Sequence, residues 1–321
     1  MIPASSDVGA RAGEPISRRE VIRGAAAAGL GLALRTTGAP GADAAALPLI
    51  TKTIPSTGEK LPVIGIGTNR FSVSSAEELA ARSAVIRELP RLGGKLIDTA
   101  RAYGDAELVI GRIVKELGSR DQLFIATKTP MYGDIPPGAE VVEQALMRLQ
   151  TSRIDLLQIH NFYRIDELFP VLQDAKQAGK IRYVGVTTSR PGQSHPQMLE
   201  VLKSRPVDFV QVNYSIEDRA AEDVLKAAHD KGVAVLVNLP LGRRSLLPKV
   251  RDRPLPDWAR EIDATSWAQV LLKYIVSHPA VTATIPGTTK LEHLQDDEQA
   301  GRGRLADAAL RRKMEEYWAS L

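Results

Sequence analysis

The chain has 321 residues, with 42 Lys and Arg against 38 Asp and Glu, and so a formal net charge of +4. This mild basicity gives no case for nucleic-acid binding, which needs clustered charge. The chain has no cysteine, which excludes disulfides, thiolate chemistry and zinc–thiolate sites, and no apolar run approaches the ~20 residues of a transmembrane helix. The length admits one barrel-sized domain of about 250 residues with a surplus at the front.

That surplus has the parts of a secretory signal. Adjacent Arg18 and Arg19 precede an apolar run from Gly24 to Leu34, and small residues follow shortly before Leu47. A charged region, a short apolar region and a small-residue cleavage site make up such signals. The paired arginines resemble the twin-arginine export motif. We predict a signal peptide and linker over residues 1–46 and export by the twin-arginine machinery, to the periplasm or beyond. A disordered basic tail is the alternative, and the protein is cytoplasmic if the signal is not functional.

From residue 47 onward, strand-like and helix-like patterns alternate. Leu49–Val63 alternates around a Ser-Thr-Gly turn, which predicts a β-hairpin, and Val63–Thr68 follows as the first strand of the main sheet. The two glycines of that strand predict a close approach of backbones. The other apolar runs that we interpret as strands end at Asp98, Lys128, His160, Thr187, Asn213, Asn238 and Pro286. Helices are predicted over 75–89, 105–117, 138–150, 166–178, 194–203, 219–231 and 263–277, from about 290, and over 303–321.

Regular alternation of this kind favours one parallel barrel over two domains. We therefore predict a (β/α)8 barrel over residues 47–321, with an N-terminal hairpin and an extra C-terminal helix. One connection, Pro240–Ile262, is too long for a structureless loop inside such a domain, so it is either functional or a misassignment.

Chemistry-bearing side chains stand at the ends of three consecutive strands. Asp98, Lys128 and His160 each close an apolar run, and Tyr103 follows Asp98 on the next loop. The carboxyl ends of barrel strands are where active sites form. A lysine that closes a buried strand needs a partner, which Asp98 can provide. We predict that Lys128 lowers the pKa of Tyr103, that His160 directs a hydrogen-bond donor into the same cavity, and that Tyr103 gives a proton to a carbonyl oxygen.

The segments LIDTARAYGDAE, FIATKTP and DLLQIHN resemble the aldo/keto reductases, and the resemblance extends from about Leu61 to about Asp297. It implies a (β/α)8 barrel that binds a nicotinamide dinucleotide without a Rossmann domain and reversibly transfers a hydride to aldehydes or ketones. It also implies that the hairpin closes the bottom of the barrel and that the 240–262 loop folds over the cofactor. In that case Arg243 or Arg244 meets the pyrophosphate, unless both are solvated.

The resemblance also assigns cofactor contacts. Thr187, Thr188 and Gln211 occupy the carboxamide-binding positions, although the family usually has Asn in place of Thr188, and Asn238 replaces the aromatic that commonly stacks on the ring. Lys290 is placed for the 2′-phosphate, which favours NADP(H) over NAD(H), although an arginine common in the family is replaced by His293. The assigned cofactor positions are Thr187, Thr188, Gln211, Asn238, Leu241, Arg243, Gly287, Thr288, Thr289, Lys290, His293 and Asp297.

Substrate selection is expected at the mouth of the barrel. Asn69 and Asn161 stand where many relatives carry tryptophans, which indicates a more open and more polar pocket. The expected mouth residues are Asn69, Phe71, Met131, Tyr132, Asn161, Phe162 and Tyr163, together with the 240–262 loop.

The sequence thus favours an oxidoreductase acting on a small carbonyl or alcohol substrate. A cofactor-binding sensor with negligible turnover is the alternative, and the departures at Thr188 and Asn238 favour it slightly. A nicotinamide-independent lyase or isomerase on the same barrel is a third interpretation, against which the phosphate motif at 287–290 argues.

Overall fold

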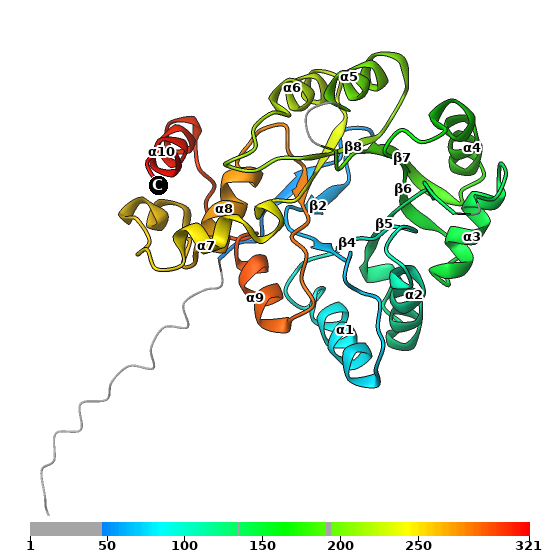
Figure 1. The fold of residues 1–321 in the computed structure, drawn as a ribbon, viewed down its shortest axis with the longest axis horizontal. Helices are drawn as coiled ribbons and strands as arrows, with labels where there is room; N and C mark the ends of the chain where they lie inside the picture. Colours follow the sequence, from blue (N-terminus) through cyan, green and yellow to red (C-terminus); the bar gives the residue numbers. More distant parts are fainter. Residues whose placement is uncertain (1–46, 134, 191–193) are drawn as a thin grey trace, which may run out of the picture. The chain divides into compact units, whose positions relative to one another are not determined.

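Eight parallel strands, paired in sequence order, form the centre of the molecule (Figure 1). The computed structural model describes residues 47–133, 135–190 and 194–321, so the signal predicted over 1–46 lies outside the described residues. The strands are β3 (Ile66–Gly67), β4 (Leu96–Asp98), β5 (Phe124–Lys128), β6 (Ile154–His160), β7 (Ile181–Thr187), β8 (Phe209–Asn213), β9 (Ala234–Asn238) and β10 (Ala283–Thr284).

The first and last strands meet and close the barrel. Parallel bridges join Ile64 to Thr284 and Gly67 to Gly287, and the Gly67 amide donates to the Pro286 carbonyl at 2.9 Å. A Cβ atom at Gly67 would lie 2.9 Å from the Ile285 carbonyl oxygen, so a side chain there would push the two strands apart. The close backbone approach predicted from the glycines is confirmed.

Helices surround the strands, as Figure 1 shows. The Ser75 hydroxyl caps the first of them by accepting the Glu78 amide, at the start of the helix predicted over 75–89. The surrounding helices are α1 (Ala76–Glu88), α2 (Ala106–Leu117), α3 (Glu140–Arg148), α4 (Ile165–Gln177), α5 (His195–Ser204), α6 (Glu222–Asp230), α8 (Trp267–Val276) and α9 (Leu291–Gln299). The extra helix α10 (Ala308–Ala319) packs outside, where Arg311 lies over the Tyr274 ring of α8. None of the helices in the described part of the chain is long and apolar enough to cross a membrane.

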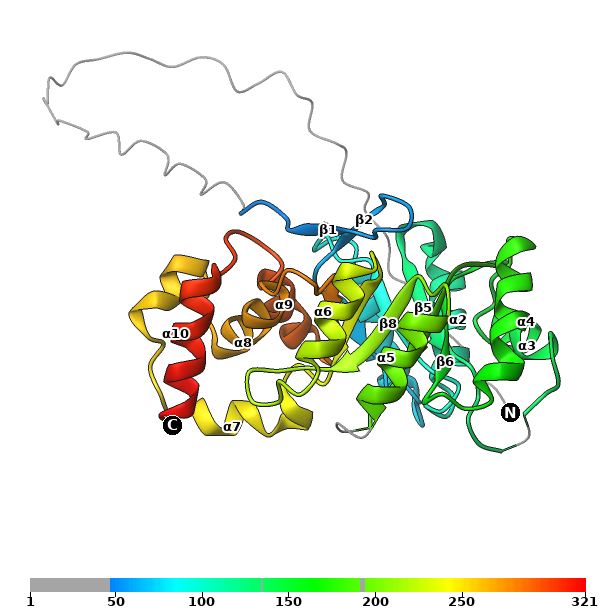
Figure 2. The same cartoon turned by 90° about the horizontal axis from the view of Figure 1, so that it is seen from above.

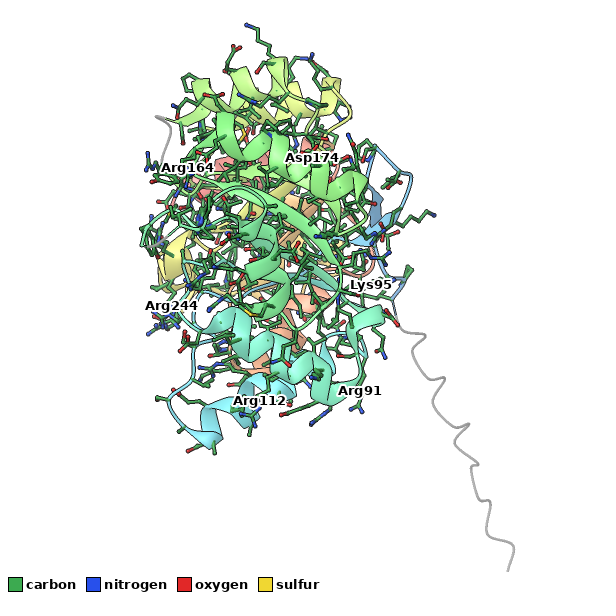
Figure 3. The ribbon with its side chains drawn as sticks, turned by 90° about the vertical axis from the view of Figure 1, so that its right-hand side faces the viewer. Arg91, Lys95, Arg112, Arg164, Asp174 and Arg244 are labelled. Atoms are coloured by element: carbon green, nitrogen blue, oxygen red, sulfur yellow. The ribbon has the colours of Figure 1, made fainter. Side chains whose placement is uncertain are left out.

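The predicted hairpin covers the amino-terminal end of the barrel. It consists of antiparallel β1 (Thr51–Thr53) and β2 (Lys60–Pro62), and it places Ile54 and Leu61 in the barrel interior. In Figure 2 the hairpin lies on the opposite side of the barrel from α7 (Leu246–Val250). Figure 3 shows the same two ends of the barrel. Arg164 and Arg244, which come after strands β6 and β9, lie at one end, and Lys95, which comes just before β4, lies at the other.

Inside the barrel, side chains two residues apart along each strand share one face. The lower positions are apolar and include Phe124, Tyr183 and Phe209, whose ring centroids lie 5.3–6.0 Å apart. The interior positions nearest the carboxyl ends of the strands are polar and form the upper layer. That layer consists of Asp98, Lys128, Gln158, His160, Thr187, Gln211, Asn213 and Asn238. The apolar floor thus positions a polar ring at the carboxyl ends of the strands.

The 240–262 connection is more ordered than its sequence indicates. It contains η3 (Gly242–Arg244), α7 and η4 (Asp257–Ile262), and it buries Leu246, Trp258 and Ile262 against the core. Its apolar residues are too widely spaced for a periodic pattern, yet each short helical turn contributes one or two of them. The connection therefore has secondary structure of its own. Its length does not come from a misassignment, and the barrel strands on either side are correctly assigned.

Candidate active site

A buried ion pair lies at the centre of the polar layer. The Lys128 ammonium donates to both Asp98 carboxylate oxygens at 2.8 and 2.7 Å and to the Thr99 carbonyl at 2.8 Å. Both side chains are 2% exposed. Burial lowers the pKa of Lys128, but the Asp98 carboxylate and the nearby Tyr103 phenol outweigh it and raise the pKa above its ordinary value. The predicted partnership of Asp98 and Lys128 is thus confirmed, and Lys128 stays charged.

Tyr103 lies against this pair on the loop after β4. The Lys128 Nζ atom is 5.3 Å from the centroid of the tyrosine ring, and the ring is half-buried. The loop is held from two sides. The Ser72 hydroxyl donates to the Tyr103 carbonyl at 2.9 Å, and the Arg148 guanidinium donates to the Gly104 carbonyl at 2.9 Å.

The pKa of Tyr103 differs from the prediction. The Lys128 ammonium lowers it, as predicted, but burial and the Asp98 carboxylate raise it by more. The pKa therefore lies above its ordinary value of 10, and the prediction of a net lowering is wrong. The reason is that the sequence identifies the lysine but not the depth of burial, which disfavours the phenolate. At neutral pH Tyr103 is a phenol.

His160 closes the neighbouring strand β6 and is 4% exposed. Burial, with a smaller contribution from the Lys128 charge, lowers its pKa to about 3, so the imidazole is neutral. Its Nδ1 atom is buried and has no hydrogen-bond partner among the described residues. A neutral imidazole beside a charged lysine can donate a hydrogen bond without adding charge to the site.

The three residues expected at the carboxamide are buried at or just after strand ends, but two of them are already engaged. The Thr188 hydroxyl pairs with the Ser194 hydroxyl at 2.9 Å. The Gln211 amide oxygen accepts from Gln158 Nε2 at 2.6 Å, within the polar layer. Thr187 is buried at the end of β7. Asn238 is half-buried, and its amide nitrogen donates to the Thr188 carbonyl at 3.3 Å.

The phosphate motif forms the start of α9. The Thr288 hydroxyl accepts the Lys290 amide at 3.1 Å, which organises the turn before the helix. Lys290 and His293 are exposed, and Gly287 is exposed beside the Asn69 amide oxygen. Asn69 therefore borders this motif, at the rim where β3 meets β10. Of the other residues assigned to the cofactor, Thr289 is half-buried, Leu241 packs against the core and Arg243 is exposed. Asp297 is buried on α9, and burial together with the Asp296 charge raises its pKa to about 8.

The mouth residues divide into two groups. Tyr132 and Tyr163 are 60% and 42% exposed, and Asn161 joins two neighbouring loops by accepting the Ser189 amide and donating to the Met131 sulfur. Phe162 is half-buried against the core. Phe71 is fully buried in the core with Arg82 over its ring, so it cannot contact a substrate in this structure, contrary to prediction. Its apolar neighbours α1 and α2 provide a better environment than the open mouth.

Sequence reasoning missed three residues of the site. Ser72 and Arg148 hold the loop that carries Tyr103, and no local pattern connects them to it. Asn213 lines a cavity of about 210 Å³ with Ser189, Tyr214, Ser215, Asp218, Leu239, Gly242 and Arg243. A signal for Asn213 was available, because two neighbouring strands, FVQVN and AVLVN, both end in asparagine.

A larger cavity of about 350 Å³ lies at the other end of the barrel, around the Arg120–Asp155 and Arg182–Asp155 ion pairs, away from this chemistry.

The opposing influences on Tyr103 yield a first prediction. Replacing Lys128 by Met removes the influence that lowers the phenol pKa, so that pKa should rise further. The measurement is the absorbance titration of Tyr103, taken as the difference from a Tyr103→Phe background. In the matched control, Asp98→Asn with Lys128→Met, the opposing carboxylate is also lost, and the rise should be smaller. Removing one partner of a buried pair costs about 3–5 kcal/mol, so the fold of each variant is checked first. An unchanged or lowered pKa in the single variant contradicts the assignment.

The neutral state of His160 yields a second prediction. The ordinary pKa of 6.5 applies in the unfolded chain and about 3 in the folded one, so between these values only the unfolded chain binds the proton. The stability that follows is fully present above pH 6.5 and is lost as the pH falls towards 3. The free energy of unfolding of His160→Gln, from urea titrations across this range, should therefore fall less steeply than that of the parent protein. Exposed His229 provides the control variant, His229→Gln. Equal slopes for all three proteins would contradict the prediction.

Comparison with known proteins agrees with this geometry. The sequence profile of the aldo/keto reductase family matches residues 63–313. The chain is 32% identical over 216 residues to aldo-keto reductase YhdN of Bacillus subtilis, covering 62% of this chain and 64% of that protein. It is 27% identical over 303 residues to aldo-keto reductase yakc [NADP(+)] of Schizosaccharomyces pombe, covering 79% and 87%. The holo structure of aldo-keto reductase AKR11C1 from Bacillus halodurans is 26% identical and superposes with a TM-score of 0.69 over 84% of this chain and 96% of the other. With a matching profile over most of its length, the chain belongs to the aldo/keto reductase family.

Proposed function

We propose that this protein interconverts aldehydes or ketones and alcohols with NADP(H), and that Tyr103 is the group that gives and takes the proton. One observation carries the proposal, namely the buried Lys128–Asp98 pair against the ring of a protonated Tyr103, beside a neutral His160. In these environments the lysine is charged, the imidazole is neutral and the phenol is protonated.

The proton route follows from these environments. Tyr103 carries its proton at neutral pH and can give it to a carbonyl oxygen. Lys128 lies close enough to stabilise the phenolate that remains, and Asp98 keeps Lys128 charged and in place. His160 contributes a neutral donor that can orient the substrate oxygen. In the direction of oxidation, the phenolate accepts the alcohol proton and the same groups act in reverse.

The residues present fit a nicotinamide dinucleotide. A cavity lined by Ser189, Asn213, Leu239 and Arg243 lies at the ends of β7, β8 and β9, next to the polar layer. When bound, the cofactor supplies or takes up the hydride. Thr288 and Lys290 at the start of α9 would hold the 2′-phosphate, because the only ion pair of Lys290 in the described part of the chain is an exposed 3.5 Å contact with Glu292. The name of the S. pombe relative, which specifies NADP(+), supports the same preference.

The mouth favours small or polar carbonyl substrates. Asn161 and the exposed Tyr132 and Tyr163 offer hydrogen-bonding groups rather than a closed aromatic box. The competing interpretation, a sensor with negligible turnover, requires the cofactor but not the ion pair. Burying Lys128 and Asp98 costs several kcal/mol per charge before their attraction is counted, which favours a catalytic use. Nicotinamide absorbance during incubation with a panel of aldehydes distinguishes the two.

A third prediction concerns the proton donor. Tyr103→Phe removes the hydroxyl but keeps the ring that packs against Lys128, so it should lower kcat by roughly two to four decades. The dissociation constant for NADP(H), measured by quenching of protein fluorescence, should stay within about threefold, because the hydroxyl is not among the residues expected to hold the cofactor. Tyr132→Phe is the matched control, since Tyr132 is an exposed tyrosine that touches the same loop through the Ala102 carbonyl. Near-normal turnover in Tyr103→Phe would overturn the role of this residue.

We also propose that residues 1–46 direct export by the twin-arginine machinery, as the paired arginines indicate. A fourth prediction follows. With both Arg18 and Arg19 replaced by Lys, the protein should remain in the cytoplasm, whereas the parent chain is found outside it, because the charge is kept but the motif is lost. Fractionation followed by immunoblotting measures the location. Replacement of Arg11 and Arg23 by Lys is the control for a general effect of arginine number. Cytoplasmic location of the parent chain contradicts the proposal.

A further inference from the structure

Two asparagines at the rim of the barrel are arranged as a pair. Asn213 and Asn238 are register partners at the ends of β8 and β9. Both hold the turn that follows β7, since Asn213 Nδ2 donates to the Ser189 carbonyl at 3.2 Å and Asn238 Nδ2 donates to the Thr188 carbonyl at 3.3 Å. A carbonyl can only accept, so each amide nitrogen must face the turn. The orientation of both amide oxygens is thereby fixed on the other side.

Those two oxygens are buried and have no hydrogen-bond partner among the described residues. Leaving a buried acceptor unpaired costs about 1–3 kcal/mol, and buried polar atoms are seldom left in that state. Asn213 is 8% exposed and lines the cavity of about 210 Å³. The cavity is bordered by strained backbone, because Leu239 and Arg243 have positive φ values of 53° and 50°. One unpaired acceptor on the cavity wall, Asn213, and a second on its register partner, Asn238, indicate a ligand that brings two donors.

Two of the three residues expected to bind a nicotinamide carboxamide, Thr188 and Gln211, are occupied elsewhere, and Thr187 is the third. The Thr188 hydroxyl pairs with Ser194 and accepts the Arg190 amide, and the Gln211 oxygen accepts from Gln158. Asn238 also stands where an aromatic would cover the ring. The Asn213 and Asn238 oxygens lie at the ends of their strands, whereas the other unpaired amide oxygen of the polar layer, Gln158 Oε1, lies two residues before the end of β6.

We propose that Asn213 and Asn238 together accept the two N–H donors of the cofactor's carboxamide, so that this chain holds the nicotinamide by its edge rather than by stacking on its face. The inference rests on the proposed function. Neighbouring parallel strands are about 4.8 Å apart, so oxygens on register partners can flank one –NH2 group. Both oxygens are neutral, which suits an uncharged amide and gives no attraction to a phosphate.

The test is equilibrium binding without turnover. The probes are NADP+ and its 3-acetylpyridine analogue, in which a methyl ketone of similar size replaces the carboxamide and removes both donors. Dissociation constants come from isothermal titration calorimetry. The parent protein should bind the analogue at least about tenfold more weakly, the effect of one to two hydrogen bonds. In Asn213→Ala and in Asn238→Ala, this ratio should shrink, and in the double variant it should fall below about threefold.

Asn161→Ala is the matched control. Asn161 holds the same turn by accepting the Ser189 amide at 3.2 Å, but its oxygen is already paired. Its loss should weaken both dinucleotides alike and leave the ratio unchanged. Thermal unfolding of each variant checks the turn independently.

The outcomes separate this inference from the proposed function. If neither dinucleotide binds the parent protein, the proposed function itself fails. If the parent protein binds both dinucleotides equally well, the proposed function stands and the inference is overturned. The two asparagine oxygens would then bind water or substrate hydroxyls. Discrimination that survives in the double variant, or that falls as much in Asn161→Ala, also overturns it.

Discussion

The polar layer depends on one interaction, the ion pair between Lys128 and Asp98. Two charges that are each 2% exposed lose their hydration, and the pair is retained because the ammonium finds three acceptors, both carboxylate oxygens and the Thr99 carbonyl, at 2.7–2.8 Å. These acceptors come from β4 and the residue after it, while the lysine comes from β5, so the pairing of the two strands sets the geometry. Such a pair adds little net stability. Its value lies in holding a positive charge at a fixed place in a site that excludes water.

The protonation states around the pair follow from that charge and from burial. His160 stays neutral because burial and Lys128 both disfavour a second cation. Tyr103 feels two opposite charges at once, and burial decides the sign, so the phenol keeps its proton. The site thus holds a phenol that keeps its proton, next to the buried Lys128 cation, which can stabilise the phenolate once the proton has left. A lower pKa in the resting site would leave part of the tyrosine ionised and unable to act as the acid in reduction.

Much of this was readable from the sequence, because strands impose a period of two. Once Phe124 and Leu156 are placed in the interior, Lys128 and His160 four residues later must share it, and Asp98 follows Leu96 in the same way. The helix bounds were also close, since caps such as Ser75 act locally. What could not be read depended on distant or opposing contributions. The direction of the Tyr103 pKa shift is set by opposing effects of burial, Lys128 and Asp98. The burial of Phe71 depends on the packing of α1 and α2 over it. The pairing of Gln158 with Gln211 joins residues 53 apart in the chain.

The backbone is strained at two places on the carboxyl-terminal rim of the barrel. Non-glycine residues with positive φ follow two strands, at Asn161, Phe162 and Arg164 after β6 and at Leu239, Arg243 and Arg244 after β9. Such conformations persist only where the surroundings enforce them. After β9 the enforcement comes from further along, because Leu246, Trp258 and Ile262 anchor α7 and η4 in the core. The whole 240–262 connection therefore cannot swing as a lid without exposing these apolar side chains. Residues 239–245, the strained segment that carries Arg243 and borders the cavity beside Asn213, precede these anchors.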